Sequence, residues 1–583
     1  MKTRICLAAA FAMFAVLAPL SAATTLSPTP GGWDVEANRL PAPDSRPPHL
    51  RVTNSWDGSS STNWHTAANW SLNHVPLSTE DVYIPVTGIT RWPVLSADGH
   101  CNALTVNSGA SLTISGCELI VYTDAHLNGG FNMTGNSYLD VYMDLIFGAG
   151  ALANFNNPGA FILVRGDVEF LAGSSVNIPS TMLDLYGTPV SYVRTYAPTT
   201  LGELYTYKPS SGFTSISNLS THSLTLYMIW VSSNTTLYHP YSGTTYVTGD
   251  LLFSDTSLVQ MNSGTISCTG GANGAIEIND SDCYLNNLTL NKSGSAVLGL
   301  ETNLTVRGDL VIQTGVFDPG GWGVTVGGDW INQVGDGGFD EAGSTVVLNG
   351  TDDQSISSEN FHNLVLNKSA GVMSIPAGST VSCNSYDWVA GAYTVAGGSF
   401  TVADLADPGV FGTITLSAGT ITYTQDTEQY IDLRCNLTIS GGIFNLYGGN
   451  GTAWFSYIDV ASLTMTNGTL DFKNQGIRIP ASYAFTENIS GGGIRTVGSF
   501  LIERSDFNPG GGTIELYGSA NATLQNTDGS NLYRVFINKS ATREGNELWP
   551  GSDPRDPQLE PLTRLNQVTG SGPLDINGNL VIN

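Results

Sequence analysis

The sequence predicts an all-β chain that forms a right-handed, parallel β-helix-like solenoid with a capped N-terminal end. Short apolar segments alternate with period two, glycine-containing turn motifs recur at the start of such segments, and longer stretches return further along the chain. A unit of one turn and one short strand cannot bury its own apolar face, so it must stack on the next unit.

The alternation is clearest in ALTVNSGASLTISGCELIVY, which begins at Ala103. Its apolar side chains are expected to point to one side, between Ser and Gly turns: Leu104, Val106, Leu112, Ile114, Leu119 and Val121. No stretch of comparable length carries a helical stripe with capping residues, which favours an all-β chain.

Two kinds of repeat support stacking. Residues 339–370 return as residues 507–541, and a third, looser copy ends at Gly294, each with Asn-Lys-Ser near its end. A shorter unit is found as GDVEF at Gly166, GDLLF at Gly249, GDLVI at Gly308 and GNLVI at Gly578. The irregular spacing of the copies favours coils of variable length over the evenly sized blades of a β-propeller.

The N-terminus predicts export. Residues 1–23 place basic residues before an apolar run and end in small residues, as a secretory signal peptide does. We expect residues 24–54 to form a Pro-rich extended leader, residues 55–100 a Trp-rich capping module and residues 101–583 the repeat region. No later stretch reaches the roughly 18 apolar residues of a spanning helix, so we expect an extracellular or cell-surface protein without a transmembrane segment.

The last residues, PLDINGNLVIN, match the start of a unit that elsewhere continues into a further coil. A chain ending at this point would leave an exposed strand edge. The pattern therefore predicts that the repeat region is incomplete and that Asn583 lies within a longer protein.

The net charge of the chain reduces the range of binding partners that we expect. The chain has 49 Asp and Glu against 22 Lys and Arg, a formal net charge of -27. Such a chain repels phosphate backbones and anionic lipid headgroups, which disfavours nucleic-acid and membrane-surface binding. Glycans or other surface proteins remain as expected partners.

Residues 55–95 and the repeats resemble a known group of proteins. The motifs are Trp-x-Gly, Asn-Trp, Val-Pro and the strand DVYIP, followed by repeats such as NLTLNKSG and LTVRGDLVIQTGVFDPGG. They resemble large secreted, β-helix-rich repeat proteins of environmental and gut bacteria, many from Bacteroidetes-like lineages, which often end in a cell-surface sorting domain. The resemblance covers most of residues 55–583 and implies an adhesin-like role.

Four tryptophans of the N-terminal block could serve two purposes: Trp56, Trp64, Trp70 and Trp92. Indole rings can stack on sugars, and they can also cover the apolar end of a solenoid. Terminal repeats need such a cover, which favours capping.

Six cysteines follow the signal peptide, and they allow 15 disulfide connectivities. Cys101 with Cys117, and Cys268 with Cys283, are separated by about one expected coil, so these pairs are candidate disulfides. Cys383 and Cys435 could be buried thiols. No CxxC motif supports zinc or redox chemistry.

Arg-Gly-Asp, the integrin-binding tripeptide, occurs at residues 165–167 and 307–309. The equivalent turns at Gly249 and Gly578 read Thr-Gly-Asp and Asn-Gly-Asn, so we interpret the Gly and its polar neighbour as requirements of the repeat turn.

No pattern of catalytic residues is found, so no catalytic residue, cofactor or metal ligand is assigned. HExxH, GxSxG and P-loop motifs are absent, and the clustered His65, His74 and His100 lack metal-ligand spacing. Acidic residues gather in turn contexts at 280–282, 336–341 and 352–353, where weak calcium binding is an alternative to solvation.

The sequence therefore predicts a secreted or cell-surface structural, adhesin-like protein. The alternatives are a polysaccharide-active lyase or hydrolase, which would require aligned carboxylates on successive coils, and a carbohydrate-binding protein that uses the N-terminal tryptophans.

Overall fold

The computed structural model describes residues 52–187, 190–208, 213–218, 223–239, 242–405, 412–425, 431–433, 435–448, 455–458, 462–481, 486–525, 530–540, 568–571 and 580–582. Within them the chain is nearly all β, with one short 3-10 helix, η1 (Ala67–Asn69). Parallel strands form a β-solenoid of about 19 turns, which confirms the predicted fold class. The chain divides into unit 1, Met1–Ser267 with Glu277–Cys283, and unit 2, Cys268–Ile276 with Tyr284–Asn583.

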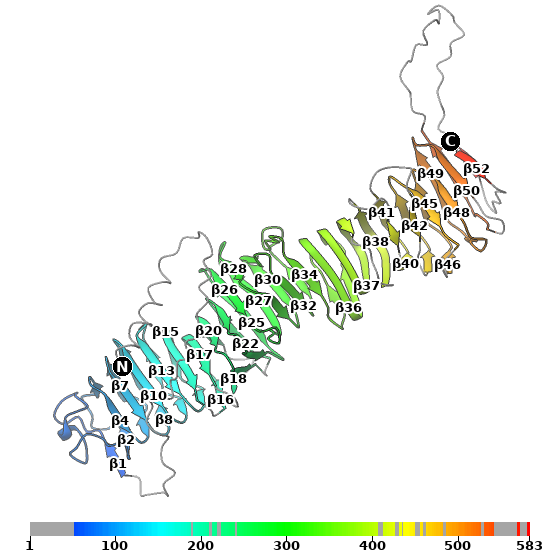
Figure 1. The fold of residues 1–583 in the computed structure, drawn as a ribbon. Helices are drawn as coiled ribbons and strands as arrows, with labels where there is room; N and C mark the ends of the chain where they lie inside the picture. The colour runs from blue at the N-terminus through cyan, green and yellow to red at the C-terminus, as the bar shows by residue number, and fades with distance from the viewer. Residues whose placement is uncertain are drawn as a thin grey trace, which may run out of the picture. The chain divides into compact units, whose positions relative to one another are not determined.

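Three rows of strands build unit 1, and successive strands of a row lie side by side in Figure 1. Row A is a 10-stranded sheet of β1 (Val52–Ser55), β2 (Glu80–Ile84), β5 (Leu104–Val106), β8 (Ala125–Leu127), β11 (Leu145–Phe147), β14 (Val168–Phe170), β16 (Ser191–Thr195), β18 (Phe213–Asn218), β21 (Thr236–Tyr238) and β24 (Leu258–Gln260).

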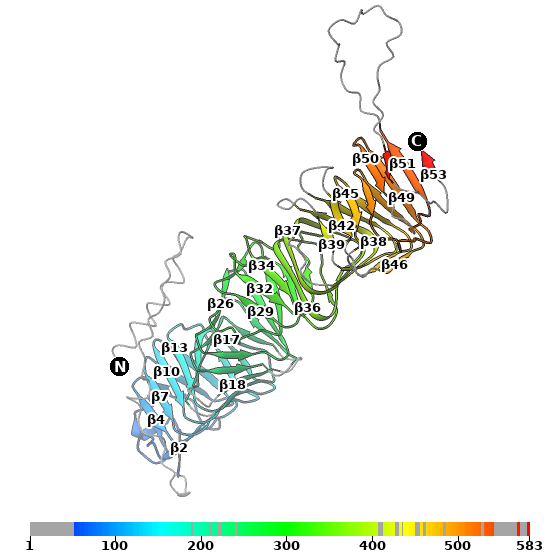
Figure 2. The same ribbon diagram turned by 45° about the vertical axis from the view of Figure 1, so that its right-hand side comes forward.

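Row B contains β3 (Val94–Leu95), β6 (Ser111–Ser115), β9 (Gly130–Thr134), β12 (Leu152–Asn154), β19 (Leu224–Leu226) and β22 (Thr244–Val247). Row C contains β4 (Gly99–Cys101), β7 (Glu118–Val121), β10 (Ser137–Val141), β13 (Ala160–Val164), β20 (Met228–Val231) and β23 (Leu251–Phe253). The longer β15 (Ser175–Tyr186) and β17 (Thr199–Tyr207) contribute to both rows. Figure 2 shows β4, β7, β10 and β13 of row C following one another along one face.

The boundary between the units falls within β25 (Thr265–Gly270) and β26 (Gly274–Ile278). After these two strands, unit 2 continues with β27 (Asn287–Lys292), β28 (Val297–Leu300), β30 (Leu310–Thr314), β31 (Val316–Asp318) and β33 (Trp330–Asn332).

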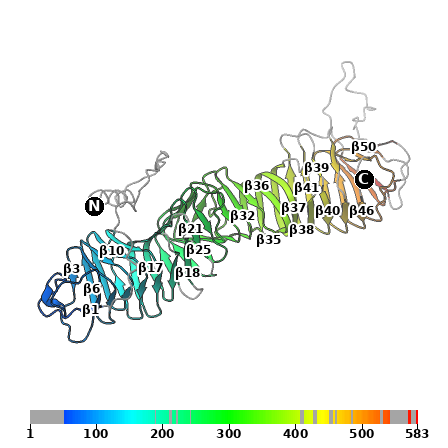
Figure 3. The ribbon, with the colours of Figure 1, turned by 60° about the horizontal axis from the view of Figure 1, so that its bottom comes forward.

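A 16-stranded sheet of unit 2 contains β29 (Leu304–Val306), β32 (Gly323–Val326), β34 (Thr345–Leu348), β35 (Gln354–Ser355), β36 (Glu359–Ile375), β37 (Thr380–Leu405), β38 (Gly412–Thr424), β40 (Cys435–Ile439), β41 (Ile443–Tyr447), β43 (Ser462–Met465), β44 (Thr469–Phe472), β46 (Thr486–Ile489), β47 (Gly493–Thr496), β49 (Thr513–Gly518), β51 (Val535–Lys539) and β53 (Leu580–Ile582). A 6-stranded sheet contains β39 (Asp432–Leu433), β42 (Phe455–Ile458), β45 (Gly476–Ile479), β48 (Phe500–Ile502), β50 (Ala522–Gln525) and β52 (Val568–Ser571). Figure 3 shows β37, β38, β40 and β46 along one face of unit 2.

The period-two alternation of the sequence decides which side chains enter the core. In β6, Leu112 and Ile114 are fully buried, and the Ser and Thr residues between them are half-buried. In register with them lie Phe131 and Met133 of β9, which are also buried. Each rung therefore buries its apolar side against the same side of the next rung, about 4.8 Å away.

The recurrent Gly-Asp unit has a structural cause. In unit 1 the main-chain N–H of Asp144 donates to Asp124 Oδ1 at 3.2 Å, and that of Asp167 donates to Asp144 Oδ1 at 2.8 Å. Because the Asp144 carboxylate lies over the next turn, a Cβ at Gly166 would collide with it. In unit 2 the same bonds join Asp309 N to Asn287 Oδ1 and Asp329 N to Asp309 Oδ1. The motif is thus a ladder of side-chain acceptors from rung to rung.

The Asn-Lys-Ser repeats place lysines in the interior. Lys292 and Lys368 are 0% and 1% exposed. The Lys368 ammonium donates to the carbonyl oxygens of Gly350 at 2.7 Å and Asp352 at 2.8 Å, and to Gln354 Oε1 at 2.6 Å. A buried cation needs such partners, so each lysine ties its own strand to a turn of an earlier coil.

Candidate functional site

Three of the four N-terminal tryptophans form a buried cluster. Trp56, Trp64 and Trp70 are at most 1% exposed, and the Trp70 ring lies 5.0 Å from Trp56 and 4.7 Å from Trp64 in edge-to-face contacts. Trp70 Nε1 donates to the Trp64 carbonyl at 2.6 Å. These three rings offer no open face to a sugar and fill the first coil, whereas Trp92 is half-buried.

The predicted disulfides are not formed. Within the described residues no disulfide joins any cysteine, and all six that follow the signal peptide are buried. The reason is coil length, because Cys101 lies in register with Val121, 20 residues on, and not with Cys117. Cys117 Sγ instead donates to the Leu95 carbonyl at 3.2 Å.

The second pair is not bonded either. Cys283 Sγ donates to the carbonyl of Ser257 and accepts from the N–H of Val259, both at 3.2 Å, so these partners lie about one coil earlier in the chain. Burial raises the pKa of Cys383 and Cys435 to about 12, which keeps these thiols protonated and unreactive.

Both Arg-Gly-Asp turns are engaged within their own units. The Arg165 guanidinium lies 4.0 Å from the centroid of the Tyr142 ring and 5.0 Å from that of Tyr186. Asp167 accepts from the N–H of Tyr192 at 3.0 Å and forms an ion pair with Arg194 at 2.6 Å.

The second tripeptide is held in the same way. The Arg307 guanidinium lies 3.3 Å from the centroid of the Tyr284 ring, and Asp309 Oδ1 accepts from the N–H of Asp329 at 2.8 Å. Neither tripeptide presents its Arg and Asp side chains as free groups.

The acidic turns also bond locally. Asp353 Oδ1 accepts from the N–H of Val372, Asp280 Oδ1 from that of Asp282, and Glu341 Oε1 from the Asn360 amide. In the part of the chain that the structure describes, no group of three His, Cys, Asp or Glu side chains is placed to hold a metal ion. The same part contains no helix long and apolar enough to cross a membrane.

The outer side of row C carries many aromatic rings. Figure 1 labels most of these strands side by side. The aromatic residues at outward positions are Tyr122, Tyr138, Tyr142, Phe161, Tyr186, Tyr205, Tyr207 and Trp230. On unit 2, by contrast, the outward positions of four successive rungs hold Thr394, Thr415, Thr438 and Thr464.

Two aromatic pairs on this side differ in geometry. Tyr138 and Phe161 stack with centroids 5.0 Å apart and planes 11° apart, so they cover each other. Tyr205 and Trp230 lie 5.1 Å apart at 65°, an edge-to-face arrangement. In such a pair the ring that points its edge at its partner keeps both of its own faces clear of that partner.

Carboxylates surround the second pair. Asp184 is in register with Tyr205 on the preceding rung, and Glu203 lies two residues before Tyr205 on the same strand. We name Asp184, Glu203, Tyr205, Tyr227, Trp230 and Asp250 the aromatic-acidic cluster. All six belong to unit 1.

Tyr227 extends the cluster toward solvent. It is 39% exposed, and its ring lies so close to Gly249 that a Cβ there would meet it at 3.0 Å. Asp250 follows directly on this turn.

Carboxylates act on Glu203, Tyr205 and Tyr227, and Lys208 lies close enough to Asp184 for their charges to interact. Burial and then the charge of Asp250 raise the pKa of Glu203. Burial raises the pKa of Tyr227, with Asp250 and Glu203 adding to the effect, and burial with Asp184 raises that of Tyr205 to about 12. The charged groups that act on Glu203 and Tyr227 are thus carboxylates, which favours a neutral or cationic ligand.

The cluster was missed by sequence reasoning, which singled out the tryptophans near the N-terminus. A usable signal was present, because Tyr205 and Trp230 occupy the alternate positions of their strands where other strands carry Ser or Thr. The two rings lie side by side only because of the register between neighbouring coils, and this register cannot be predicted from the sequence of a single strand.

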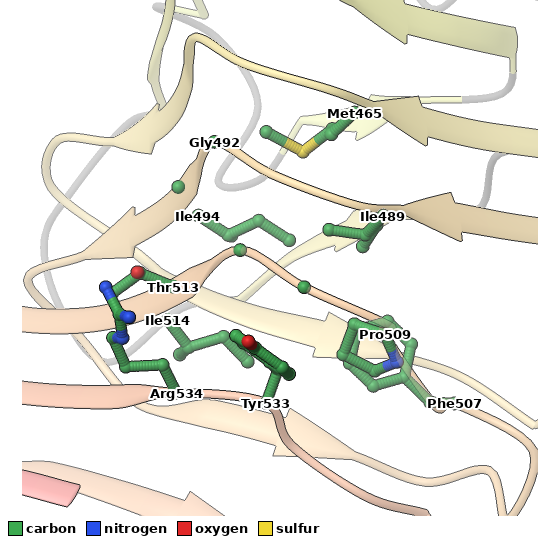
Figure 4. A pocket seen from close by; sticks show the side chains of 13 residues that line it. Met465, Ile489, Gly492, Ile494, Phe507, Pro509, Thr513, Ile514, Tyr533 and Arg534 are labelled. Atoms are coloured by element: carbon green, nitrogen blue, oxygen red, sulfur yellow. The ribbon is translucent and has the colours of Figure 1, made fainter. Parts of the chain in front are cut away.

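A small pocket in unit 2 is apolar. Figure 4 shows Met465, Ile489, Ile494, Phe507 and Ile514 around it. Its volume is about 10 Å³, roughly the space of one water molecule. We interpret it as a packing gap between coils.

Comparison with known proteins adds one match. The model of a family described as a domain of unknown function, DUF8693, matches residues 55–170. The match covers the buried tryptophans and the first coils of unit 1, and it ends before the aromatic-acidic cluster. No curated protein and no solved structure matches the chain.

Proposed function

We propose that the chain is exported and acts at the cell surface or outside the cell as a structural, adhesin-like protein. A β-solenoid is consistent with such a role. Stacked coils give a stiff scaffold on which outward side chains repeat at fixed spacing, an arrangement suited to many weak contacts. The N-terminal signal-peptide pattern, which lies outside the described residues, supports export.

The observation that carries this proposal is the aromatic-acidic cluster on the outer side of row C. Tyr and Trp are enriched where proteins bind partners, since they supply large contact area at low entropic cost. Half-buried rings, at positions like those that hold threonine on four rungs of unit 2, indicate a contact surface.

The geometry does not favour a polysaccharide lyase or hydrolase. Such an enzyme needs a pair of carboxylates free to act on one bond. On row C, Asp140 is 6% exposed and accepts from Tyr186 Oη at 2.5 Å, so it is committed to a contact within the protein. Asp184 lies two rungs after Asp140 on row C and belongs to the aromatic-acidic cluster.

The test is an adhesion assay. Beads coated with residues 24–583 should be retained on intact bacterial cells and on their extracellular polysaccharide more strongly than uncoated beads. Polysaccharide incubated with the protein should release neither reducing ends nor unsaturated products. Retention no greater than that of uncoated beads would refute the adhesin-like role, and steady product release would establish the enzyme instead.

A further inference from the structure

One outer face of unit 2 is a regular array of hydroxyl and amide side chains. It lies on the neighbouring strands β38, β40, β43 and β46, and Figure 3 labels β38, β40 and β46 along one face. Each of these strands, together with the residue after its last buried side chain, has three outward positions, and all of them hold Ser, Thr or Asn. We name these residues the polar array: Thr413, Thr415, Ser417, Asn436, Thr438, Ser440, Ser462, Thr464, Thr466, Thr486, Asn488 and Ser490.

The columns of the array are straight. Thr415, Thr438 and Thr464 pair in register on successive strands, and no shift interrupts the pairing from β38 to β46. The outermost column follows the same order, because the N–H of Ser440 donates to Leu416 O at 2.9 Å. Strands repeat every ~4.8 Å and outward residues of one strand every ~6.6 Å, so the side chains form a two-dimensional grid.

The same coils place their charged side chains on another face. Asp471 of β44, Arg495 of β47 and Glu515 of β49 lie in register at alternate positions of their strands. The polar array contains no charged residue, although the chain has a net charge of -27. A neutral surface without counter-ions could cover the array without burying an unpaired charge, which would be costly.

The threonines of the central column are suited to hold water in fixed positions. Their β-branched side chains adopt few rotamers, which fixes both the methyl and the hydroxyl group. Within the described residues, the hydroxyl groups of Thr415, Thr438 and Thr464 form no hydrogen bond with another protein group. On the prism face of hexagonal ice, water oxygens repeat at two perpendicular spacings close to those of this grid. Waters bound to the array can therefore belong to the ice lattice as well.

A second copy of the chain is the competing occupant of this face. The array covers on the order of 300 Å² at the spacings of a parallel sheet, whereas a stable protein interface buries ~800 Å² per partner. It also lacks the Trp, Tyr and Arg side chains that dominate the binding energy of protein interfaces. A crystal lattice requires no such anchors, because each rung meets an identical row of water molecules.

We therefore propose that the polar array of unit 2 binds the surface of an ice crystal. This activity goes beyond the adhesin-like role proposed above and does not depend on it. It uses β38, β40, β43 and β46 of unit 2, whereas the aromatic-acidic cluster belongs to unit 1.

Slow growth of an ice hemisphere in a solution of fluorescently labelled residues 24–583 tests the proposal. The protein should be incorporated into the ice, and a single ice crystal grown in the same solution should develop prism facets. Thr438→Tyr, which places a ring inside the array, should lower the amount incorporated about tenfold. Thr469→Tyr, at an outward position of β44 outside the array, is the matched control and should change it less than about twofold.

A second variant and a folding measurement guard against misfolding. Thr464→Tyr, on the neighbouring rung, should reproduce the loss, and both array variants should keep the circular dichroism spectrum of the unaltered protein. The proposal is wrong if the unaltered protein is excluded from ice as an unrelated protein of the same size is, or if both folded variants enter ice as well as it does. A dimer in sedimentation that Thr438→Tyr abolishes, without incorporation into ice, would assign the face to a second copy instead.

Discussion

Lysine is rare in this protein, and its placement is unusual. Of the five described lysines, four have ammonium groups that donate to main-chain carbonyl oxygens: Lys208, Lys292, Lys368 and Lys539. Burial lowers the pKa of Lys208 and Lys539 to about 8. The fifth, Lys473, pairs with the buried carboxylate of Asp471 at 2.7 Å. Each of the five described lysines thus bonds within the protein, and four of them tie their strands to main-chain carbonyls.

This role predicts the effect of Lys368→Met. Methionine fills similar volume but leaves Gly350 O, Asp352 O and Gln354 Oε1 without their donor. We expect the free energy of unfolding in urea to fall by about 1–3 kcal/mol. Asn367→Ala, at the exposed neighbouring position of the same repeat, should change it by less than about 0.5 kcal/mol. If both changes lowered the free energy of unfolding equally, the hydrogen bonds of Lys368 would not be what stabilises this turn.

The ladder of turn carboxylates predicts that Asn can replace Asp in the Arg-Gly-Asp turns. Asp309 Oδ1 accepts from the N–H of Asp329 at 2.8 Å, and an amide oxygen can do the same. Asp309→Asn should therefore preserve stability and cell adhesion, whereas Asp309→Ala should lose about 1 kcal/mol of unfolding free energy. Loss of adhesion in folded Asp309→Asn would show that the tripeptide itself is recognised.

A buried carboxyl in unit 2 should make stability depend on pH. Glu359 accepts from Trp330 Nε1 at 3.0 Å and Asn332 Nδ2 at 2.9 Å, yet burial raises its pKa from 4.5 to about 7. Between these values the folded state holds a proton that the unfolded state has lost, so stability falls as pH rises. Glu359→Gln should remove a fall on the order of 2–3 kcal/mol between pH 4.5 and 7. Denaturant titrations at both pH values measure it, and identical pH slopes in the two proteins would contradict it.

At the scale of elements, the strands could be predicted because they depend on local alternation. Leu104, Leu112 and Leu119, expected to share one side, are all fully buried. The contacts between coils could not be predicted, because they depend on the number of residues in each coil and this number varies. The expected Cys101–Cys117 disulfide failed because the coil is 20 residues long there.

The candidate site illustrates the same limit. Asp184, Tyr205 and Trp230 meet only because the register aligns three separate strands. Two Asp–Tyr hydrogen bonds, one in each unit, also join residues that are far apart in the sequence. Asp471 accepts from Tyr517 Oη at 2.7 Å, 46 residues on, as Asp140 does from Tyr186 over the same separation. Neither pair could be predicted from a sequence repeat, because each bond joins two strands that are separated by a third.

The N-terminal coil depends on one glycine. Gly58 has φ +58°, and a Cβ there would meet Arg91 O at 2.6 Å and Trp56 Nε1 at 2.9 Å. Gly58→Ala should destabilise the tryptophan cluster by about 1–3 kcal/mol and shift tryptophan fluorescence at lower denaturant. Gly88→Ala is the control, because Gly88 has φ +80° but open space around its Cβ position. Gly88→Ala therefore introduces backbone strain but no collision. If both variants lost the same free energy of unfolding, backbone strain alone would explain the loss in Gly58→Ala.

At the scale of the molecule, a solenoid has no single core. Each rung contacts mainly its neighbours, so stability is close to a sum of local terms and damage should remain local. In unit 2, Leu437 is fully buried between Ile414 and Leu463 of the adjacent rungs. The two units are compact by their own contacts, and such units can open separately.

Leu437→Ala tests this. The cavity should cost about 2–5 kcal/mol, and hydrogen exchange followed by mass spectrometry should show faster exchange in β38, β40 and β43. Amides of unit 1 should exchange at their original rates, because no rung of that unit loses a neighbour. Thr438→Ala, at the adjacent outward position, is the control and should leave both units unchanged. Uniform acceleration through both units would mean that the solenoid unfolds as one cooperative block, and the nearest-neighbour description of its stability would then fail.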